Sequence, residues 1–313
     1  MADPGLWGGY KENGRLFHSF SKGKYFMPCD EDEQDRLDIY HKFFNVARHD
    51  VLHSTPFTAP FAGATSHSKF GAKGPLILDL GTGTGIWAID VADKYVMMQA
   101  KVYGVDLAWT QPQIIPANVS FLQGDVDSPW RGLGEDSWDL IHMRMLNGGI
   151  MDWKEVYHKV FRHLKPGHGW LEHTEIDIFP RCDDGSLPAN SALMQWTKLV
   201  LEATEEAGRP LRYNTSTGSM LAHAGLVDIR EQVIQVPLNP WPTDPHLKEI
   251  GRWYNLGFSQ GIQASALAPL TRVKGWSVGR VNNLCNEVRK EICSKKYHVY
   301  HNIHIWNARR PTL

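Results

Sequence analysis

A glycine-rich turn constrains the fold of this chain more than any other feature of its sequence. Residues 77–85 read ILDLGTGTG, in which a buried apolar run passes through three glycines into a helical pattern over residues 86–96. Glycines at such a junction let the backbone approach a ligand without a Cβ atom in the way. The turn therefore predicts a ligand site where the first strand of an α/β sheet ends.

The residues that follow alternate between short apolar runs and helical patterns. This alternation predicts an α/β fold with a Rossmann-like, doubly wound and mostly parallel seven-stranded sheet. The expected strands lie at residues 75–80, 101–107, 119–122, 138–143, 170–179, 225–236 and 297–308, and the expected helices at 86–96, 152–163 and 190–207. Two further helices, at 246–261 and 278–294, belong to a helical insertion at about 240–296 between the last two strands.

The chain before the sheet is expected to form a separate unit. Residues 1–74 read as an N-terminal arm, an amphipathic helix over 30–48 and a loop from 53 onward. The helix begins with four acidic residues, which suit the positive end of a helix dipole. We expect residues 13–45 to act as a lid over the ligand site, and residues 75–313 to form the ligand-binding domain. The alternative is a helix that only packs against the edge of the sheet.

Composition and charge exclude several classes of protein. The 313 residues are 42% hydrophobic, which is enough for a buried core, and the formal net charge of −1 provides no overall basic face for duplex DNA. We therefore expect no direct nucleic-acid binding. No apolar run reaches the roughly 18 residues of a membrane-spanning helix, and no apolar segment typical of a secretory signal follows Met1. We expect no membrane association and a location in the cytoplasm or nucleus.

The cysteines and histidines do not predict a metal site. None of the four cysteines stands in a C-x-x-C pair, and we expect them to be reduced thiols. His298, His301 and His304 share a predicted strand, on which His301 faces the opposite side from the other two. The three imidazoles therefore do not converge on one ion.

Three carboxylates, Asp79, Asp106 and Asp125, lie at the ends of successive predicted strands. The glycine spacing is G-x-G-x-G, whereas dinucleotide-binding turns read G-x-G-x-x-G and place a pyrophosphate at the helix N-terminus. A carboxylate at residue 79 repels a pyrophosphate, but it suits the ammonium group of a methionine moiety, directly or through water. The three acids together favour S-adenosylmethionine over NAD, although any one of them alone is as well explained as a solvated turn residue.

Each part of this site has an expected partner on the cofactor. Asp106, with Leu107 beside it, is expected to accept hydrogen bonds from the ribose hydroxyls. Asp125 is expected to accept one from the adenine amino group, with Val126 against the edge of the ring. The turn that approaches the cofactor comprises Gly81, Thr82, Gly83 and Gly85.

Several longer motifs carry a resemblance to a known family. They are PCDE at 28–31, QDRLD at 34–38, LDLGTGTGIWAID at 78–90, GEDSWDLIHMR at 134–144, RWYNL at 252–256 and NIHIWNARRP at 302–311. On these motifs the chain resembles the LaeA-like methyltransferases, which are named for a fungal regulator of secondary metabolism, over most of its length. The family's regulator has a long polar extension ahead of the position equivalent to Asn13, which this sequence does not show. It also usually has a cysteine where this chain has Thr82.

The resemblance implies a class I methyltransferase that uses S-adenosylmethionine in fungal secondary metabolism, with a small-molecule or protein acceptor. The alternative within the same family is a regulatory protein that acts through velvet-type partners and has little catalysis of its own. Methyl transfer depends mainly on alignment of donor and acceptor, and a base helps where the acceptor must lose a proton.

Residues after the fourth predicted strand and on the fifth are the candidates for this chemistry. The residues expected to face the transferred methyl group are His142, Met143 and Arg144, followed by Asn147, Gly148 and Gly149, with Met143 against the cofactor. His173 is a candidate base and shares a strand face with Glu175. The alternatives are a histidine packed in the core at position 142 and a structural salt bridge at Arg144.

Aromatic and basic side chains outside the sheet complete the predicted site. In the lid, the ring of Tyr25 or Tyr40 is expected to contact the sulfonium, and Arg36 is expected to reach the methionine carboxylate. Four more aromatic residues either line an apolar acceptor pocket or pack in the core: Trp241, Trp253, Tyr254 and Trp276.

Overall fold

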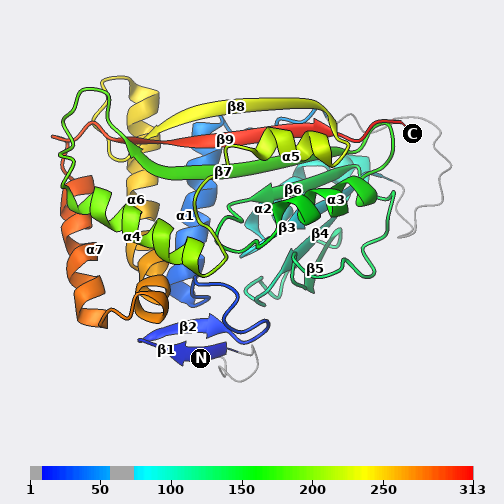
Figure 1. Cartoon of the computed structure of the whole chain (residues 1–313). Helices are drawn as coiled ribbons and strands as arrows, with labels where there is room; N and C mark the ends of the chain where they lie inside the picture. Colours follow the sequence, from blue (N-terminus) through cyan, green and yellow to red (C-terminus); the bar gives the residue numbers. More distant parts are fainter. Residues whose placement is uncertain (1–8, 57–73, 313) are drawn as a thin grey trace.

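Figure 1 shows the computed structural model of the chain, which describes residues 9–56 and 74–312. The start of the predicted arm and most of the predicted loop at 53–74 lie outside these residues. None of the described helices combines the length and the apolar character needed to cross a bilayer. The described residues also contain no group of three or more His, Cys, Asp or Glu side chains arranged to hold a metal ion.

Seven strands form one sheet in the order β5-β4-β3-β6-β7-β9-β8. They are β3 (Leu76–Leu80), β4 (Lys101–Asp106), β5 (Val119–Gln123), β6 (Leu140–Arg144), β7 (Trp170–Arg181), β8 (Val227–Pro237) and β9 (Tyr300–Arg309). The strands from β5 to β7 are parallel, whereas β9 runs antiparallel to both of its neighbours. The predicted seven-stranded, mostly parallel sheet is therefore confirmed.

Helices cover both faces of the sheet because successive strand residues point to opposite sides. The helices are α1 (Glu31–Ala47), α2 (Ile86–Lys94), α3 (Trp153–His163), α4 (Ala192–Glu206), α5 (Thr217–His223), α6 (Pro245–Ala268) and α7 (Val278–Ile292). Ile77 and Leu140 pack with α2 on one face, whereas Leu78 and Ile141 pack with α3 and α5 on the other. The doubly wound arrangement follows from this alternation. The short helix α5 was not predicted.

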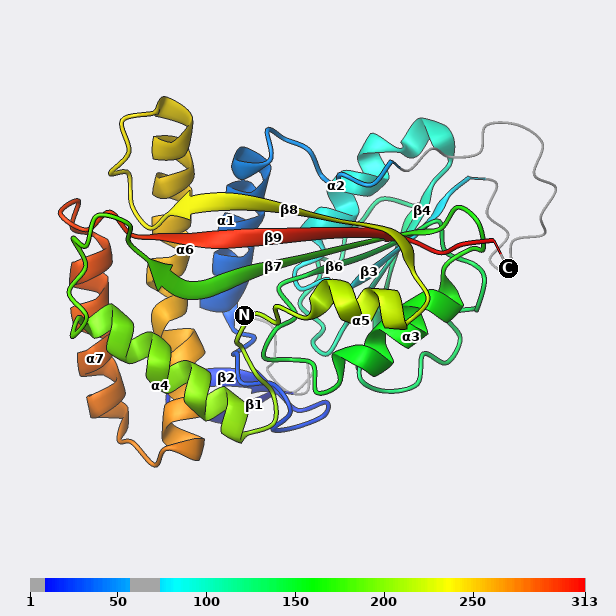
Figure 2. The same ribbon diagram turned by 45° about the horizontal axis from the view of Figure 1, so that its top comes forward.

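The strands β7, β9 and β8 extend past the shorter strands and carry a second group of helices (Figures 1 and 2). There α1, α4, α6 and α7 pack around an apolar core that includes Phe43, Trp196 and Tyr254. A Cβ atom on Gly261 of α6 would lie 3.2 Å from Cδ of Arg36 on α1, so the glycine lets these two helices approach closely. The N-terminal helix α1 therefore lies beside α6, the first of the two α-helices between β8 and β9.

The described part of the N-terminal segment begins with a hairpin that was not predicted from the sequence. Its strands, β1 (Gly9–Glu12) and β2 (Arg15–His18), form a separate antiparallel sheet. Asn13 and Gly14 have φ values of 51° and 82°, as the two central residues of a type I′ turn require. An Asn-Gly pair between short strands is a hairpin signal, and it was available in the sequence.

Candidate active site

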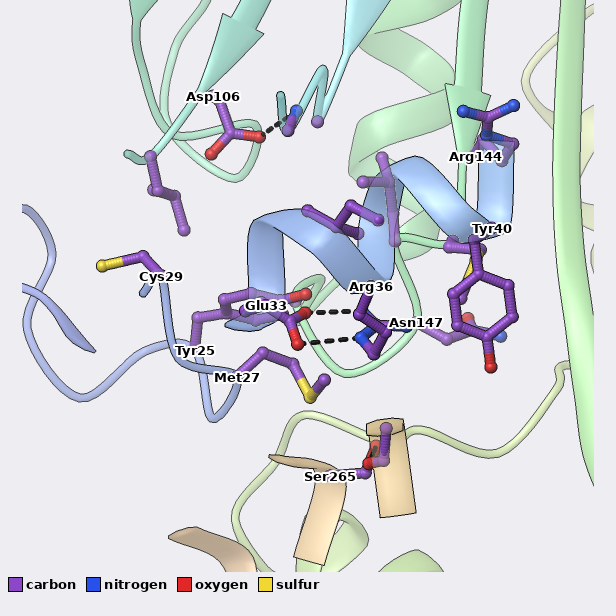
Figure 3. Close-up of a pocket in the computed structure, with 18 of the residues that line it drawn as sticks. Tyr25, Met27, Cys29, Glu33, Arg36, Tyr40, Asp106, Arg144, Asn147 and Ser265 are labelled. Atoms are coloured by element: carbon purple, nitrogen blue, oxygen red, sulfur yellow. Dashed lines mark hydrogen bonds and ion pairs between the residues drawn. The ribbon is translucent and has the colours of Figure 1, made fainter. Parts of the chain in front are cut away.

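A cavity opens where β3, β4, β5 and β6 end, and its wall is completed by α1, α4 and α6 (Figure 3). It encloses about 1420 Å³, counting the open space at its mouth. One part of its wall consists of residues predicted to bind the cofactor: Gly81, Gly83, Asp106, Leu107, Asp125 and Val126. The cavity thus lies at the carboxyl edge of the parallel strands, where doubly wound folds bind their ligands.

The glycine turn is held in a conformation that glycine adopts without strain. Gly81, Gly83 and Gly85 have φ values of 69°, 57° and 80°. A Cβ atom on Gly81 would lie 2.1 Å from Cδ2 of Leu146, and one on Gly85 would lie 2.4 Å from Cζ of Phe121. The positive φ values therefore favour glycine at all three positions, and a side chain at 81 or 85 would also have to displace Leu146 or Phe121.

Asp106 fixes the glycine turn against the end of β4. Its Oδ2 accepts a hydrogen bond from the backbone N–H of Gly83 at 2.8 Å, and its Oδ1 accepts one from Ala108 at 3.0 Å. Burial raises the pKa of Asp106 in spite of these bonds. A carboxylate oxygen can accept more than one hydrogen bond. Since Asp106 lines the cavity, it retains the capacity to accept from a ligand.

Asp125 joins the cavity wall to the N-terminal segment. Its Oδ2 accepts hydrogen bonds from Nζ of Lys24 at 2.7 Å and from Oγ of Ser21 at 3.3 Å, and its Oδ1 accepts from the backbone N–H of Asp127 at 2.9 Å. Although burial acts in the opposite direction, the hydrogen bond from Lys24 lowers the pKa of Asp125. The residue predicted to contact adenine is therefore also an anchor for the segment before α1.

Asp79 differs from the other two acids because its side chain is buried behind the cavity wall. Its side-chain oxygens bond to Oγ1 of Thr82 at 2.6 Å and to Nδ1 of His142 at 2.7 Å. In this structure the Asp79 carboxylate holds the turn and an imidazole, and its contact with the methionine ammonium, directly or through water, stays a prediction. Three other predicted cofactor residues are also not among the described residues that line the cavity: Thr82, Gly85 and Met143.

Neither predicted histidine is among the described residues that line the cavity. His142 stacks on Trp87 with the ring centroids 3.6 Å apart, and burial lowers its pKa. His173 lies between the hydroxyl of Tyr157, 2.9 Å from Nδ1, and Oε1 of Glu175, 3.1 Å from Nε2. The shared strand face of His173 and Glu175 is as predicted. Both histidines are buried and neither is among the described residues that line the cavity, so in this structure each holds neighbouring side chains, and a catalytic role for either stays a prediction.

Arg144 is the one predicted catalytic residue that lines the cavity. Its guanidinium lies 4.9 Å from the ring centroid of Phe44 and 3.4 Å from Nδ1 of His41. Burial lowers the pKa of Arg144 to about 10. None of the described carboxylates forms an ion pair with it, so the structure does not contain the salt bridge considered as its alternative role.

The sequence matches the Methyltransferase domain family over residues 60–231. It is 52% identical to the Secondary metabolism regulator LAE1 of Cochliobolus heterostrophus, over 96% of this chain and 95% of that protein. The chain belongs to the LaeA family. Other members are the Secondary metabolism regulator laeA of Aspergillus flavus, 46% identical over 96% of this chain and 78% of that protein, and the Protein-methionine methyltransferase laeA of Emericella nidulans, 44% identical over 96% and 76%.

Membership of this family confirms the resemblance seen in the motifs. The protein is a methyltransferase of the LaeA type, a family whose named members regulate secondary metabolism in fungi. Among solved structures it is similar to phosphoethanolamine N-methyltransferase 2 of Haemonchus contortus in complex with S-adenosyl-L-methionine. That similarity has a TM-score of 0.46 and 18% identity, and covers 77% of this chain and 50% of the other.

The N-terminal segment of this LaeA-family chain contributes Tyr25 and Arg36 to the cavity wall. The guanidinium of Arg36 already has a partner, because it donates to both oxygens of Glu33 at 2.8 and 2.5 Å (Figure 3). Although burial opposes it, the charge of Glu33 raises the pKa of Arg36. Any cofactor carboxylate therefore has to share this guanidinium with Glu33. Tyr40 also lines the cavity, with its ring centroid 4.8 Å from the same guanidinium.

The rest of the wall is an apolar chamber that the sequence did not reveal. Its side chains come from β7, α4, the segment after α4, and α6: Ile176, Ile178, Trp196, Leu211, Phe258 and Ser265. Tyr254 is fully buried in the core, and Trp241, Trp253 and Trp276 are not among the described residues that line the cavity. The apolar patterns predicted α4 and α6, but a helical period does not say which face meets a cavity.

Replacing Lys24 with methionine should loosen the N-terminal segment without unfolding the protein. Lys24 is partly exposed, so its pair with Asp125 contributes less than about 1 kcal/mol to folding and the melting temperature should change little. Hydrogen exchange over residues 13–45 should become faster in this variant, and in the wild type it should become slower when S-adenosylmethionine is added. Lys198→Met, which removes a surface pair on α4, is the control. Identical exchange in all three proteins, with and without ligand, would exclude a lid.

Proposed function

We propose that the cavity binds S-adenosylmethionine, with the adenosine against Asp106, Leu107, Asp125 and Val126. The observation that carries this proposal is the position of Asp106, whose two oxygens are fixed by backbone N–H groups at the cavity wall. A carboxylate held in this way is suited to accept hydrogen bonds from both hydroxyls of a ribose.

The charge of the cavity wall supports a cationic cofactor. Among the described residues, four carboxylates line it, those of Glu33, Asp106, Asp125 and Glu175. Three cations face them: Arg36 and Arg144 in the wall, and Lys24, which pairs with Asp125. The excess of negative charge suits a ligand that carries a sulfonium and an ammonium group, and it disfavours the pyrophosphate of NAD. The methionine part of the cofactor would extend past Gly81 toward Arg36 and Tyr25.

We further propose that the methyl acceptor is the thioether of a protein methionine. The chamber next to the cofactor segments is apolar, and no histidine is among the described residues that line the cavity. The carboxylates of Glu33 and Glu175 are already held, by Arg36 and by the backbone N–H groups of residues 146 and 147. A thioether carries no proton, so its methylation needs no base. One relative in the family is named a protein-methionine methyltransferase. The acceptor sulfur forms the new S–C bond while the sulfonium C–S bond breaks, and the positive charge passes from the cofactor to the acceptor.

A regulatory role through velvet-type protein partners is a second proposal. Its support is that several relatives are named regulators of secondary metabolism. Both proposals are compatible with a cytoplasmic or nuclear location. Purification from cell extract with and without S-adenosylmethionine separates them, because stable co-purification of a transcriptional partner in the absence of the cofactor favours regulation.

Calorimetry tests the cofactor directly. We expect the protein to bind S-adenosylmethionine and S-adenosylhomocysteine with micromolar or weaker dissociation constants, because the adenosine contacts are common to both. NAD should give no measurable heat, since Asp106 and Asp125 lie beside the turn that a pyrophosphate would approach. Binding of NAD without any response to either sulfur ligand would overturn the proposed cofactor site.

A further inference from the structure

Asn147 has a buried amide group without a partner. The residue follows β6, is only 7% exposed and is among the residues that line the cavity (Figure 3). Its Nδ2 is buried and has no hydrogen-bond partner among the described residues. Buried polar groups are nearly always paired, because leaving a donor unsatisfied costs the free energy of its lost hydration. An unpaired amide in a cavity wall therefore indicates a group that pairs with a ligand.

The loop that carries Asn147 is held in place by its backbone. The N–H groups of Leu146 and Asn147 donate to Oε1 of Glu175 at 2.7 and 3.1 Å, and the N–H of Gly148 donates to the carbonyl oxygen of Pro210 at 2.9 Å. The same oxygen of Glu175 lies 3.1 Å from Nε2 of His173. Because these contacts fix the backbone, the side chain cannot reach a partner by moving the loop. The amide plane can still turn about the Cβ–Cγ bond, which has a broad torsional minimum.

Asn147 lies between the two parts of the cavity. The side chain of Leu146 packs against Gly81 in the turn predicted to approach the cofactor. On the other side, the side chain of Leu211 packs against Gly148 and forms part of the apolar chamber. A group bound at Asn147 is therefore close to the boundary between the proposed sites of the methyl donor and the methyl acceptor.

We propose that Asn147 binds the acceptor, and that its Nδ2 donates a hydrogen bond to a carbonyl oxygen next to the atom that is methylated. This inference rests on the proposed function, in which the acceptor occupies the apolar chamber. For a peptide methionine, the oxygen is a backbone carbonyl and the thioether lies toward the cofactor. The carboxylate of S-adenosylmethionine is a second group that can accept this hydrogen bond. The experiment distinguishes the carbonyl oxygen of the methyl acceptor from the carboxylate of the cofactor.

Asn147→Leu, with Asn118→Leu as the matched control, tests this role through stability. The Nδ2 of Asn118 donates to the carbonyl oxygens of Ala92 and Ala100, so its replacement should lower the melting temperature. Asn147→Leu removes an unpaired amide, and the melting temperature of the ligand-free protein should stay the same or rise. A fall in melting temperature as large as that of Asn118→Leu would show that Asn147 is structural and would overturn the proposal.

Ligand binding and turnover form the second arm of the experiment. With N-acetyl-methionine methylamide as the probe acceptor, Asn147→Leu should raise KM by about threefold to tenfold, the range for one neutral hydrogen bond, and leave the affinity for S-adenosylhomocysteine unchanged. Weaker binding of S-adenosylhomocysteine but not of 5′-methylthioadenosine, which lacks the amino-acid part, would assign the amide to the cofactor carboxylate and overturn the acceptor role.

The remaining outcomes are also decisive. Unchanged cofactor affinity together with wild-type turnover of the probe by Asn147→Leu overturns the proposal. No turnover of the probe by the wild type overturns the methionine acceptor on which the proposal rests. Failure of the wild type itself to bind S-adenosylhomocysteine instead overturns the proposed function. The two failures are therefore distinguishable.

Discussion

Asp106→Ala is expected to weaken the binding of S-adenosylmethionine by about 1.5–3 kcal/mol, the scale of hydrogen bonds to a charged group. The carboxylate lies in the cavity wall at the end of β4, where the ribose hydroxyls of the cofactor are expected to bind. Calorimetry with S-adenosylhomocysteine measures the loss without interference from turnover. Glu155→Ala, which removes an exposed pair on α3, should bind as the wild type does.

The same substitution should also lower the melting temperature of the ligand-free protein. The sequence left open that Asp106 is a solvated turn residue, but its carboxylate accepts hydrogen bonds from the backbone N–H groups of Gly83 and Ala108. Alanine leaves both donors without this acceptor, and each unsatisfied donor costs about 1–3 kcal/mol if it stays buried. Asp106→Asn keeps one acceptor oxygen, so its loss of stability should be smaller. Wild-type affinity in both variants would show that Asp106 does not contact the cofactor.

Local signals in the sequence were sufficient to predict the sheet and the position of Asp106. Strand and helix periods, and glycines with positive φ, depend on residues that are close in the chain. The role of Asp79 could not be obtained in this way. Its partner His142 lies opposite it on β6, and this pairing exists only because β6 is the neighbour of β3 in the sheet. Strand order is set by tertiary packing, so the hydrogen bond between the His142 imidazole and the Asp79 carboxylate could not be predicted from the sequence.

The ion pair between Arg36 and Glu33 was missed for a different reason. Glu33 precedes Arg36 by three residues on α1, a spacing at which side chains on a helix meet, so the pair was available from the sequence. What the sequence lacked was the burial of the pair under α6, where Gly261 allows a close approach. The apolar chamber was unpredictable for the same reason. Residues such as Trp196 and Phe258 become neighbours only when α4 and α6 pack against the end of β7.

Glu172→Gln is expected to have the largest effect on folding, a loss of about 3–5 kcal/mol in the free energy of unfolding. Glu172 is fully buried on β7, and its two oxygens accept from Arg48 at 2.8 and 2.9 Å. It also accepts from the backbone N–H and the hydroxyl of Ser54. These contacts attach the chain after α1 to the middle of the sheet. The neutral amide leaves the guanidinium of Arg48 buried without its counter-charge, which is the costly way to break such a pair.

A double substitution separates the charge from the packing. Arg48→Met with Glu172→Leu removes both charges, and replacing a buried pair by apolar groups is often neutral for stability. Urea denaturation should therefore place the double variant between the wild type and Glu172→Gln, or above the wild type. A double variant less stable than Glu172→Gln would show that the contacts of Ser54, and not the ion pair, hold this segment to the sheet.

The pH dependence of the same variants gives an independent test. Burial alone would raise the pKa of Glu172, but the charge of Arg48 and its hydrogen bonds overcome this and lower it to about 2. A folded-state pKa below the unfolded value means that the unfolded chain binds the proton more tightly. The stabilisation is therefore complete above the unfolded pKa of about 4.5 and is lost as the pH falls toward 2. Glu172→Gln cannot titrate, so the difference in unfolding free energy between it and the wild type should shrink over this interval. A difference that stays constant as the pH falls would mean that Glu172 is not the ionised partner of Arg48 in the folded protein.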